Sequence, residues 1–263
     1  MDLRLAGKTA VVTGGSKGIG LEVVRQLIDE GVRVVSGSRS ITAELKETGA
    51  IAVSADLSTP DGPKQLIDEA LTALGGIDIL VNNAGIGDHA GLVQGVVNNV
   101  LTLPDSAWEQ SFNVNFYSAL RTSRAAMPSL IERDGVIVNV SSVGARLPGV
   151  GPADYNIAKT ALNGLTKALA EQFGPQGVRA IGISPGPVST GVWEDPDGFV
   201  GQLAKAQGVD RHDFADQFLA NLGASTGRVS TPEEVARLIV FAVSPNNITG
   251  TDYLIDGGAV KTA

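Results

Sequence analysis

The stretch "TAVVTGGSKGIG" (residues 9–20) decides the fold of this chain. A short apolar run (9–13) leads directly into a glycine-rich turn, and a helical pattern begins at residue 18. Glycines spaced G-x3-G-x-G leave the backbone bare at this turn, so N–H groups at the start of the helix can hold a phosphate. The spacing differs from the usual G-x-G-x-x-G fingerprint, and a glycine turn that merely packs tightly is the alternative. Its place at the first strand–helix junction favours a nucleotide site, for which the loop offers Gly14, Ser16, Lys17, Gly18, Ile19 and Gly20.

The rest of the chain continues this alternation of strand and helix. Short runs rich in Val and Ile predict strands buried on both faces at 9–13, 32–36, 50–54, 77–82, 135–140, 178–184 and 252–256. Helix-length segments lie between them, at 18–30, 62–74, 104–132, 153–173 and 231–243. The pattern predicts the α/β class: a single Rossmann-type domain over residues 1–263, with a doubly wound parallel sheet of about seven strands and helices on both faces. Residues 191–226 depart from the pattern with two further amphipathic segments, and we expect them to form a substrate lid.

The end of the second strand indicates which nucleotide binds. Chains that bind NAD place an acidic residue about twenty residues past the glycine loop, where it hydrogen-bonds the adenosine ribose. This chain instead has "SGSRS" (36–40), with Ser38 and Arg39 and no carboxylate, and it carries Lys17 inside the loop. Two cations near the ribose suit a 2′-phosphate, so the sequence predicts NADP(H) as the preferred cofactor over NAD(H). The alternative is that both cations are ordinary solvated surface charges.

Composition argues against several other classes of function. The chain has 263 residues, of which 43% are hydrophobic and 18% charged, as in an ordinary globular protein. Its net charge of −8 gives no reason to expect nucleic acid or an anionic membrane as a partner. The sequence contains no cysteine, which excludes disulfides and thiolate catalysis, and its two histidines are too few for a histidine-rich site, so we expect no metal. The sequence shows no signal-peptide pattern and no membrane-length apolar run, which makes the cytoplasm the expected location.

Residues 154–159, "DYNIAK", place Tyr155 and Lys159 one helical turn apart on one helix face. Neither side chain is reactive at neutral pH by itself, because both free side chains have a pKa of about 10. We expect the lysine ammonium to lower the pKa of Tyr155 and make it a usable general acid or base. Ser142 follows the strand at 135–140 and can donate a hydrogen bond to a substrate oxygen. The alternatives are an interfacial tyrosine, a solvated lysine and a serine that only caps a helix.

Six motifs, in order and in spacing, resemble those of the short-chain dehydrogenase/reductase family over nearly the whole chain. They are "TGGSKGIG", "NNAG" (82–85), "SS" (141–142), "YNIAK" (155–159), "PGPVST" (185–190) and "ITGTDYLIDGG" (248–258). The resemblance implies that Tyr155 passes a proton, that Ser142 polarises the carbonyl and that Lys159 also holds the nicotinamide ribose. It implies a fourth catalytic residue at Asn115, with Asn113 as the second choice, which would hold a water next to Lys159. It adds cofactor contacts at Asp56, Leu57, Asn82, Ala84, Gly85, Pro185, Gly186, Val188 and Thr190.

Together these residues predict an NADPH-dependent reductase, reversibly an alcohol dehydrogenase, that converts the ketone or 3-oxoacyl carbonyl of a small molecule to an alcohol. A non-catalytic NADP(H)-binding sensor is the rival from another class, but it should have lost Ser142, Tyr155 or Lys159. An epimerase or a dehydratase of the same fold would need further acid–base residues that the sequence does not reveal. By resemblance we expect a homo-oligomer, a tetramer or a dimer, with helices 104–132 and 153–173 at one interface.

Two segments exceed what the family commonly has. The insertion "GDHAGLVQGVVNNVLTLPDSA" after the NNAG motif could border the substrate cleft or an oligomer surface. It carries His89, and a lone loop histidine is more often exposed than catalytic. The lid carries Trp193, Phe199, Phe214 and Phe218, which suggest an apolar ketone or an acyl chain as the substrate unless these rings pack on the core.

Overall fold

Seven parallel strands form the central sheet of the computed structural model, which describes residues 2–86 and 100–261. The spatial order of the strands is β3-β2-β1-β4-β5-β6-β7, so the order reverses between β1 and β4, as in a doubly wound sheet. All seven predicted strands are present, and their ends lie within two residues of the predicted ones. The strands are β1 (Thr9–Thr13), β2 (Arg33–Ser38), β3 (Ile51–Ser54), β4 (Ile79–Asn82), β5 (Val136–Val140), β6 (Arg179–Pro185) and β7 (Asp252–Ile255).

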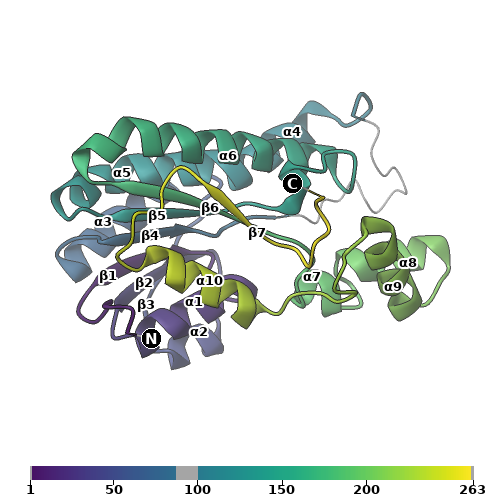
Figure 1. Ribbon diagram of the computed structural model, residues 1–263, viewed down its shortest axis with the longest axis horizontal. Coiled ribbons are helices and arrows are strands. Elements are labelled where there is room, and N and C mark those ends of the chain that lie inside the picture. Colours follow the sequence, from purple (N-terminus) through teal and green to yellow (C-terminus); the bar gives the residue numbers. More distant parts are fainter. Residues whose placement is uncertain (1, 87–99, 262–263) are drawn as a thin grey trace.

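Helices cover both faces of this sheet (Figure 1). One face carries α1 (Gly18–Asp29), α2 (Ala43–Glu47) and α10 (Pro232–Val243). The other carries α3 (Gly62–Leu74), α4 (Asp105–Phe112), α5 (Ser118–Glu132) and α6 (Ala153–Phe173). The predicted α/β class, a single Rossmann-type domain with helices on both faces, is confirmed. The short helix α2 is absent from the predicted elements, because five residues are too few to show a helical period.

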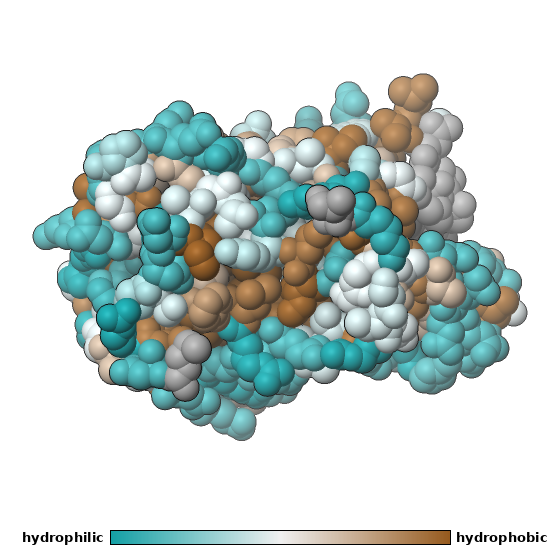
Figure 2. All heavy atoms as spheres, in the orientation of Figure 1, coloured by the Kyte–Doolittle hydropathy of each residue, from teal (hydrophilic) through white to brown (hydrophobic). Residues whose placement is uncertain are grey.

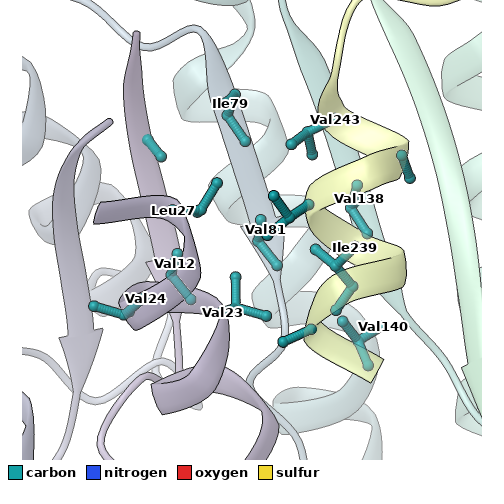
Figure 3. Close-up of a cluster of buried hydrophobic side chains, with 14 of the residues drawn as sticks. Val12, Val23, Val24, Leu27, Ile79, Val81, Val138, Val140, Ile239 and Val243 are labelled. Carbon is teal, nitrogen blue, oxygen red and sulfur yellow. The ribbon is translucent and has the colours of Figure 1, made fainter. Parts of the chain in front are cut away.

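Two apolar clusters fill the space between the sheet and its two helical layers. Figure 3 shows part of the first, in which Leu27 of α1 and Ile239 of α10 pack on valines and isoleucines of β1, β4 and β5. The second lies between the sheet and helices α3, α5 and α6, and it includes Leu66, Leu130 and Ile137. Both faces of the central strands are therefore buried, which explains their continuous apolar sequences.

The predicted helix at 104–132 is present but changes its winding in the middle. Between α4 and α5 the chain forms a π-helical turn, η2 (Asn113–Tyr117). The side-chain amide of Asn115 donates to the carbonyl of Ser111 at 3.0 Å, the acceptor that the backbone N–H of residue 115 would use in a regular α-helix. Turns of this kind occur frequently at functional sites, and this one positions Asn115.

Helix α10 is closed at both ends by side chains. At its start, Thr231 and Glu234 form a reciprocal capping box, with hydrogen bonds of 3.3 and 2.9 Å. At its end, the guanidinium of Arg179 donates to the carbonyl oxygens of Ala242, Val243, Ser244 and Ile248, at 2.9–3.2 Å. Burial lowers the pKa of Arg179. The positive side chain thus satisfies carbonyls that the last turn of a helix leaves without partners.

The segment 191–226 projects from one end of the sheet (Figure 1) and contains α7 (Gly191–Glu194), α8 (Phe199–Gln207) and α9 (Arg211–Leu222). It has a small hydrophobic core of its own, built on Trp193, Val200, Ala215 and Leu219. The two predicted amphipathic segments are therefore α8 and α9. The function of this segment as a lid stays a prediction.

Apolar side chains gather on the face shown in Figure 2 over α10 and the adjoining strand β7. Phe241 of α10 is one of the large apolar side chains that remain exposed, and β7 is an edge strand whose four residues are only half-buried. Among the residues that the structure describes, no helix combines the length and the hydrophobicity that crossing a lipid bilayer requires.

Candidate active site

A cleft of about 440 Å³ lies at the carboxyl ends of β1, β2 and β4, where the strand order reverses. Ligands of open α/β sheets bind at such a reversal, because the loops from the two halves of the sheet diverge there. Of the predicted cofactor contacts, the cleft is lined by Gly14, Ser16, Lys17, Gly18, Ile19, Gly20, Ser38, Arg39, Asp56, Leu57, Ala84, Gly85 and Thr190. Nine further residues that were not predicted as cofactor contacts also line the cleft: Ser40, Thr42, Ala55, Ser58, Asn83, Ile86, Val114, Gly191 and Val192.

The glycine loop forms the floor of the cleft, and two of its glycines are required by the geometry. Gly18 has a φ of +57° and lies against Thr190, so this loop touches the loop that follows β6. A Cβ on Gly20 would collide with the carbonyl oxygen of Gly14 and with the side chain of Asn83. The loop therefore packs tightly and also leaves its backbone bare, so the structure is consistent both with a tightly packed turn and with a phosphate-binding loop.

The start of α1 fits an anionic group. Lys17 occupies the cap position in an extended conformation without a side-chain cap, and residues 18–21 contain no acidic side chain. The first N–H groups of a helix carry partial positive charge and stabilise phosphate. The residues present therefore fit the pyrophosphate of a dinucleotide.

Hydroxyl groups and two cations surround the end of β2. The Ser16 hydroxyl contacts the hydroxyl of Ser38 and donates to the carbonyl oxygen of Ser40 at 2.5 Å. Thr42 donates to the carbonyl oxygen of Ser16 at 2.9 Å, which ties the glycine loop to the segment that carries Arg39. Lys17 follows Ser16 and Arg39 follows Ser38 in the sequence, and the side chains of both cations are exposed and line the cleft.

Asp56 is the acidic residue of the cleft wall, and its carboxylate is already engaged. Ser58 donates its hydroxyl at 2.7 Å and its backbone N–H at 3.0 Å to Asp56 Oδ1. These hydrogen bonds, with a smaller contribution from the charge of Arg39, hold the pKa of Asp56 below its usual value. The carboxylate is thus ionised and oriented at neutral pH.

Asn82 is not among the residues that line the cleft, and its predicted contact with the cofactor stays a prediction. Its side chain is buried in a polar network between β4, β5 and helices α5 and α6: it accepts from Thr122 at 2.7 Å and donates to Ser123 and Asn139. Asn139 in turn donates to Thr166. The next residue, Asn83, lines the cleft instead and donates to the carbonyl oxygens of residues 13 and 14. Successive side chains of an extended chain point to opposite sides, so only one of the two asparagines can face the cleft.

Pro185, Gly186 and Val188 are not among the residues that line the cleft. Pro185 ends the buried strand β6, and Gly186 packs against Asp256, where a Cβ would lie 2.9 Å from its Cα atom. Val188 is buried and forms a bridge with Ser230. Within this motif Thr190 lines the cleft, and the predicted cofactor contacts of all four residues stay predictions.

Ser142, Tyr155 and Lys159 meet at the carboxyl end of β5. Ser142 is hydrogen-bonded to Tyr155, and its Oγ accepts the backbone N–H of Gly144 at 3.1 Å. The Lys159 ammonium is buried, donates to the carbonyl oxygen of Val140 at 2.8 Å and lies 5.6 Å from the centre of the Tyr155 ring. The helix face predicted from the spacing therefore points both side chains toward one point.

The predicted lowering of the Tyr155 pKa is wrong, because the structure raises this pKa. Burial raises the pKa of Tyr155, and the hydrogen bond from Ser142 opposes this only in part. Burial also lowers the pKa of Lys159, to about 8. The ammonium donates to the carbonyl oxygen of Val140, and desolvation is the largest cause of the pKa shift at both groups.

Asn115 joins this group from the π-helical turn. Its Oδ1 accepts the N–H of Ile86 and its amide donates to the carbonyl of Ile86, both at 3.1 Å. A Cβ on Gly85 would lie 2.9 Å from Asn115 Oδ1 and 3.2 Å from Lys159 Nζ. Gly85 thus lies directly against both polar groups. The structure brings together the four residues predicted to be catalytic, which are Asn115, Ser142, Tyr155 and Lys159.

The aromatic residues of the lid pack on one another. Trp193 is buried, its ring meets that of Phe218 edge to face at 5.7 Å, and Phe199 and Phe214 pack against the same small core. These aromatic rings therefore stabilise the segment 191–226, and their presence gives no reason to expect an apolar substrate. His89 and most of the insertion that contains it lie outside the described residues.

Comparisons with known proteins identify the family to which the chain belongs. The sequence model described as short chain dehydrogenase matches residues 8–197. The chain is 32% identical to a 3-alpha-(or 20-beta)-hydroxysteroid dehydrogenase of Mycobacterium bovis, over 99% of this chain and 92% of that protein. It is 33% identical to L-fucose dehydrogenase of Mus musculus, over 97% and 89%.

The solved structures include L-sorbose reductase from Gluconobacter frateurii in complex with NADPH and L-sorbose. Its fold matches with a TM-score of 0.89, at 29% identity and over 100% of both chains. Because the family model spans most of the chain and these relatives match along nearly their whole length, the chain belongs to the short-chain dehydrogenase/reductase family of oxidoreductases.

Proposed function

We propose that this protein reduces the carbonyl of a small molecule to an alcohol with NADPH, by hydride transfer with Tyr155 as the proton donor. The observation that carries the proposal is the hydrogen-bonded pair of Ser142 and Tyr155 beside buried Lys159, at the sheet edge that holds the dinucleotide cleft. Membership of a family of oxidoreductases supports the same reaction class.

The cofactor, when bound, supplies the hydride that reduces the carbonyl carbon. Tyr155 keeps its proton through the physiological pH range because burial raises its pKa, which suits a group that must donate a proton to the substrate oxygen. Ser142 can share its hydroxyl with that oxygen as negative charge develops. Lys159 stays largely protonated at neutral pH and places a positive charge near the phenolate that remains after transfer.

NADP(H) is proposed as the preferred cofactor. Neither Lys17 nor Arg39 forms an ion pair with another residue of the described parts of the chain, and both line the cleft beside the hydroxyls of Ser16 and Ser38. This donor set suits a phosphate, whereas the cleft residue Asp56 is held by Ser58. The NADPH bound to the sorbose reductase of similar fold supports the same choice.

The substrate is proposed to be a secondary alcohol or the corresponding ketone. The named relatives act on hydroxysteroids, L-fucose and L-sorbose, which differ in polarity but share an oxygen on a carbon that can accept hydride. Because the lid rings are already packed, ketoses belong in the substrate panel beside steroid ketones and 3-oxoacyl esters.

The test is NADPH oxidation with this panel, run in parallel with Tyr155→Phe. We expect turnover of at least one carbonyl compound and a loss of about a hundredfold or more in kcat for the variant, the usual scale of general acid catalysis. NADPH binding, measured by calorimetry, should survive in the variant. Turnover of a good substrate by Tyr155→Phe at the unmodified rate would refute the assigned chemistry.

A homo-oligomer is proposed from the family resemblance. The half-buried edge strand β7 and the exposed Phe241 support one self-association surface, and the exposed Tyr117 at the end of η2 supports another. Light scattering across a range of protein concentrations tests this, and a mass of one chain at every concentration would contradict it.

A further inference from the structure

The loop between β5 and α6, residues 141–152, is held by two side chains from one face of α6. The amide of Asn156 donates to the carbonyl oxygens of Val150 at 2.6 Å and Pro148 at 3.4 Å. Thr160, one turn later, donates to the carbonyl oxygen of Ala145 at 3.0 Å. Asn156 is 2% exposed, so its polar groups depend on these partners rather than on water.

The other end of the Asn156 side chain touches the backbone beside the catalytic serine. A Cβ on Gly144 would collide with Asn156 Oδ1, which shows that this oxygen lies directly against the Gly144 Cα atom. The N–H of Gly144 donates to Ser142 Oγ, and Ser142 is hydrogen-bonded to Tyr155. A continuous series of contacts therefore runs from Asn156 through Gly144 to the catalytic pair.

The loop has further anchors that do not depend on Asn156. Arg146 forms an ion pair with Asp252 of β7 at 3.0 Å, and Thr160 holds Ala145 independently. Removing the Asn156 amide should thus leave the loop attached near residues 145 and 146. What it releases is the Gly144 backbone on one side and the Pro148–Val150 stretch on the other.

We propose that Asn156 is a positioning residue for carbonyl reduction, which holds the Ser142 hydroxyl against Tyr155 through Gly144 and fixes the loop at Pro148 and Val150. The inference rests on the proposed function, since Ser142 and Tyr155 are assigned the chemistry there. It adds a residue that makes no contact with the reacting atoms but sets their geometry.

The first test compares Asn156→Ala with Asn246→Ala. Asn246 is also partly buried and multiply hydrogen-bonded, but it lies at the far end of α10. We expect Asn156→Ala to lower kcat/KM by about tenfold to a hundredfold, because small misplacements of catalytic groups have effects of this size. NADPH affinity should stay unchanged. Asn246→Ala should lower the melting temperature and leave kcat/KM within twofold of the unmodified enzyme, roughly the limit of such assays.

A second test uses the crowding at Gly144. Gly144→Ala should reduce kcat/KM in the presence of Asn156, because the new methyl group forces Oδ1 and the backbone apart. In the double variant Gly144→Ala/Asn156→Ala this collision is gone, so its kcat/KM should be no lower than that of Asn156→Ala alone. Fully additive losses would show that the two residues act separately, and the positioning inference would then be wrong.

A third measurement needs no substrate. The phenol of Tyr155 can be titrated by ultraviolet absorbance, as the difference between each protein and its Tyr155→Phe derivative. Loss of the Ser142 contact should move this titration to higher pH in Asn156→Ala and not in Asn246→Ala, because that contact lowers the pKa of Tyr155.

The outcomes separate the two claims. If the unmodified enzyme turns over no carbonyl compound, the proposed function fails, and the Tyr155 titration alone decides the positioning. If it is active but Asn156→Ala keeps its kcat/KM, or if it is inactive and the titration does not move, the inference about Asn156 is overturned.

Discussion

Lys159 should make the free energy of unfolding depend on pH in a way that a single substitution removes. Burial lowers its pKa to about 8 in the folded protein, whereas the unfolded chain returns it to 10.5. Between these values the unfolded state binds more protons than the folded state, so stability rises with pH. Below this window the amine is charged in both states and the cost of burying the charge is complete. Above it the amine is neutral in both states and the cost has gone.

The magnitude follows from the difference between the two pKa values. Each pKa unit is worth about 1.4 kcal/mol, so a fall from 10.5 to about 8 corresponds to a gain of about 3 kcal/mol as pH rises through the window. Lys159 is 3% exposed, and solvent screening therefore removes little of this. Lys159 should thus destabilise the protein without cofactor at neutral pH.

The assay is urea unfolding between about pH 7 and pH 10.5 of the unmodified protein and Lys159→Met. Methionine keeps the length of the side chain, and the lost bond to Val140 shifts the variant by an amount that does not depend on pH. The free energy of unfolding of the unmodified protein should therefore rise by about 3 kcal/mol relative to that of Lys159→Met across the range. Lys167→Met, an exposed lysine of the same helix, is the control and should run parallel to the unmodified protein. Parallel curves for Lys159→Met as well would refute the reasoning.

Three further outcomes are expected. Arg39→Asp should move the ratio of kcat/KM for NADPH and NADH toward NADH, because it removes a phosphate partner and adds a ribose acceptor; equal values for the two cofactors in the unmodified enzyme would contradict this. Arg179→Met should lower the free energy of unfolding by about 2–4 kcal/mol in urea titrations, because it leaves the carbonyls at the end of α10 without their charged donor, whereas exposed Arg237→Met should change it by less than about 0.5 kcal/mol. Hydrogen exchange in the lid should slow when NADPH and substrate bind, and protection that is strong and unchanged throughout 191–226 would indicate a fixed structural element.

Most of the fold could be predicted because its determinants are local. The central strands are buried on both faces, and their uninterrupted Val and Ile runs are a property of the sequence alone. The π-helical turn at Asn115 could not, since it depends on a side-chain amide competing with the backbone for the Ser111 carbonyl. Only the three-dimensional surroundings of Asn115, with Ile86 on its other side, make that exchange favourable.

The site was predicted less completely, for two physical reasons. The choice between Asn82 and Asn83 depends on which side of the chain faces the cleft, and β4, buried on both faces, has no alternation in its sequence that reveals this. The pKa of Tyr155 depends on burial and on the hydrogen bond from Ser142, and the spacing of two residues on a helix reveals neither. Spacing brings groups together, but their titration is decided by what surrounds them.

The polar network around Asn82 has a consequence for how the sheet assembles. Asn82 and Asn139 are opposite each other on neighbouring parallel strands, and they exchange hydrogen bonds with each other, with α5 and with α6 in a layer that is otherwise apolar. A slip of β4 against β5 by one position would still bury valine and isoleucine on both faces, so the hydrophobic effect discriminates weakly between the two alignments. The slip would, however, leave the buried side-chain amides without hydrogen-bond partners, which would lower the free energy of unfolding by about 1–3 kcal/mol for each unpaired group. We therefore expect the asparagine pair to favour the observed register of β4 against β5 over its neighbours, because only this register gives both amides their partners.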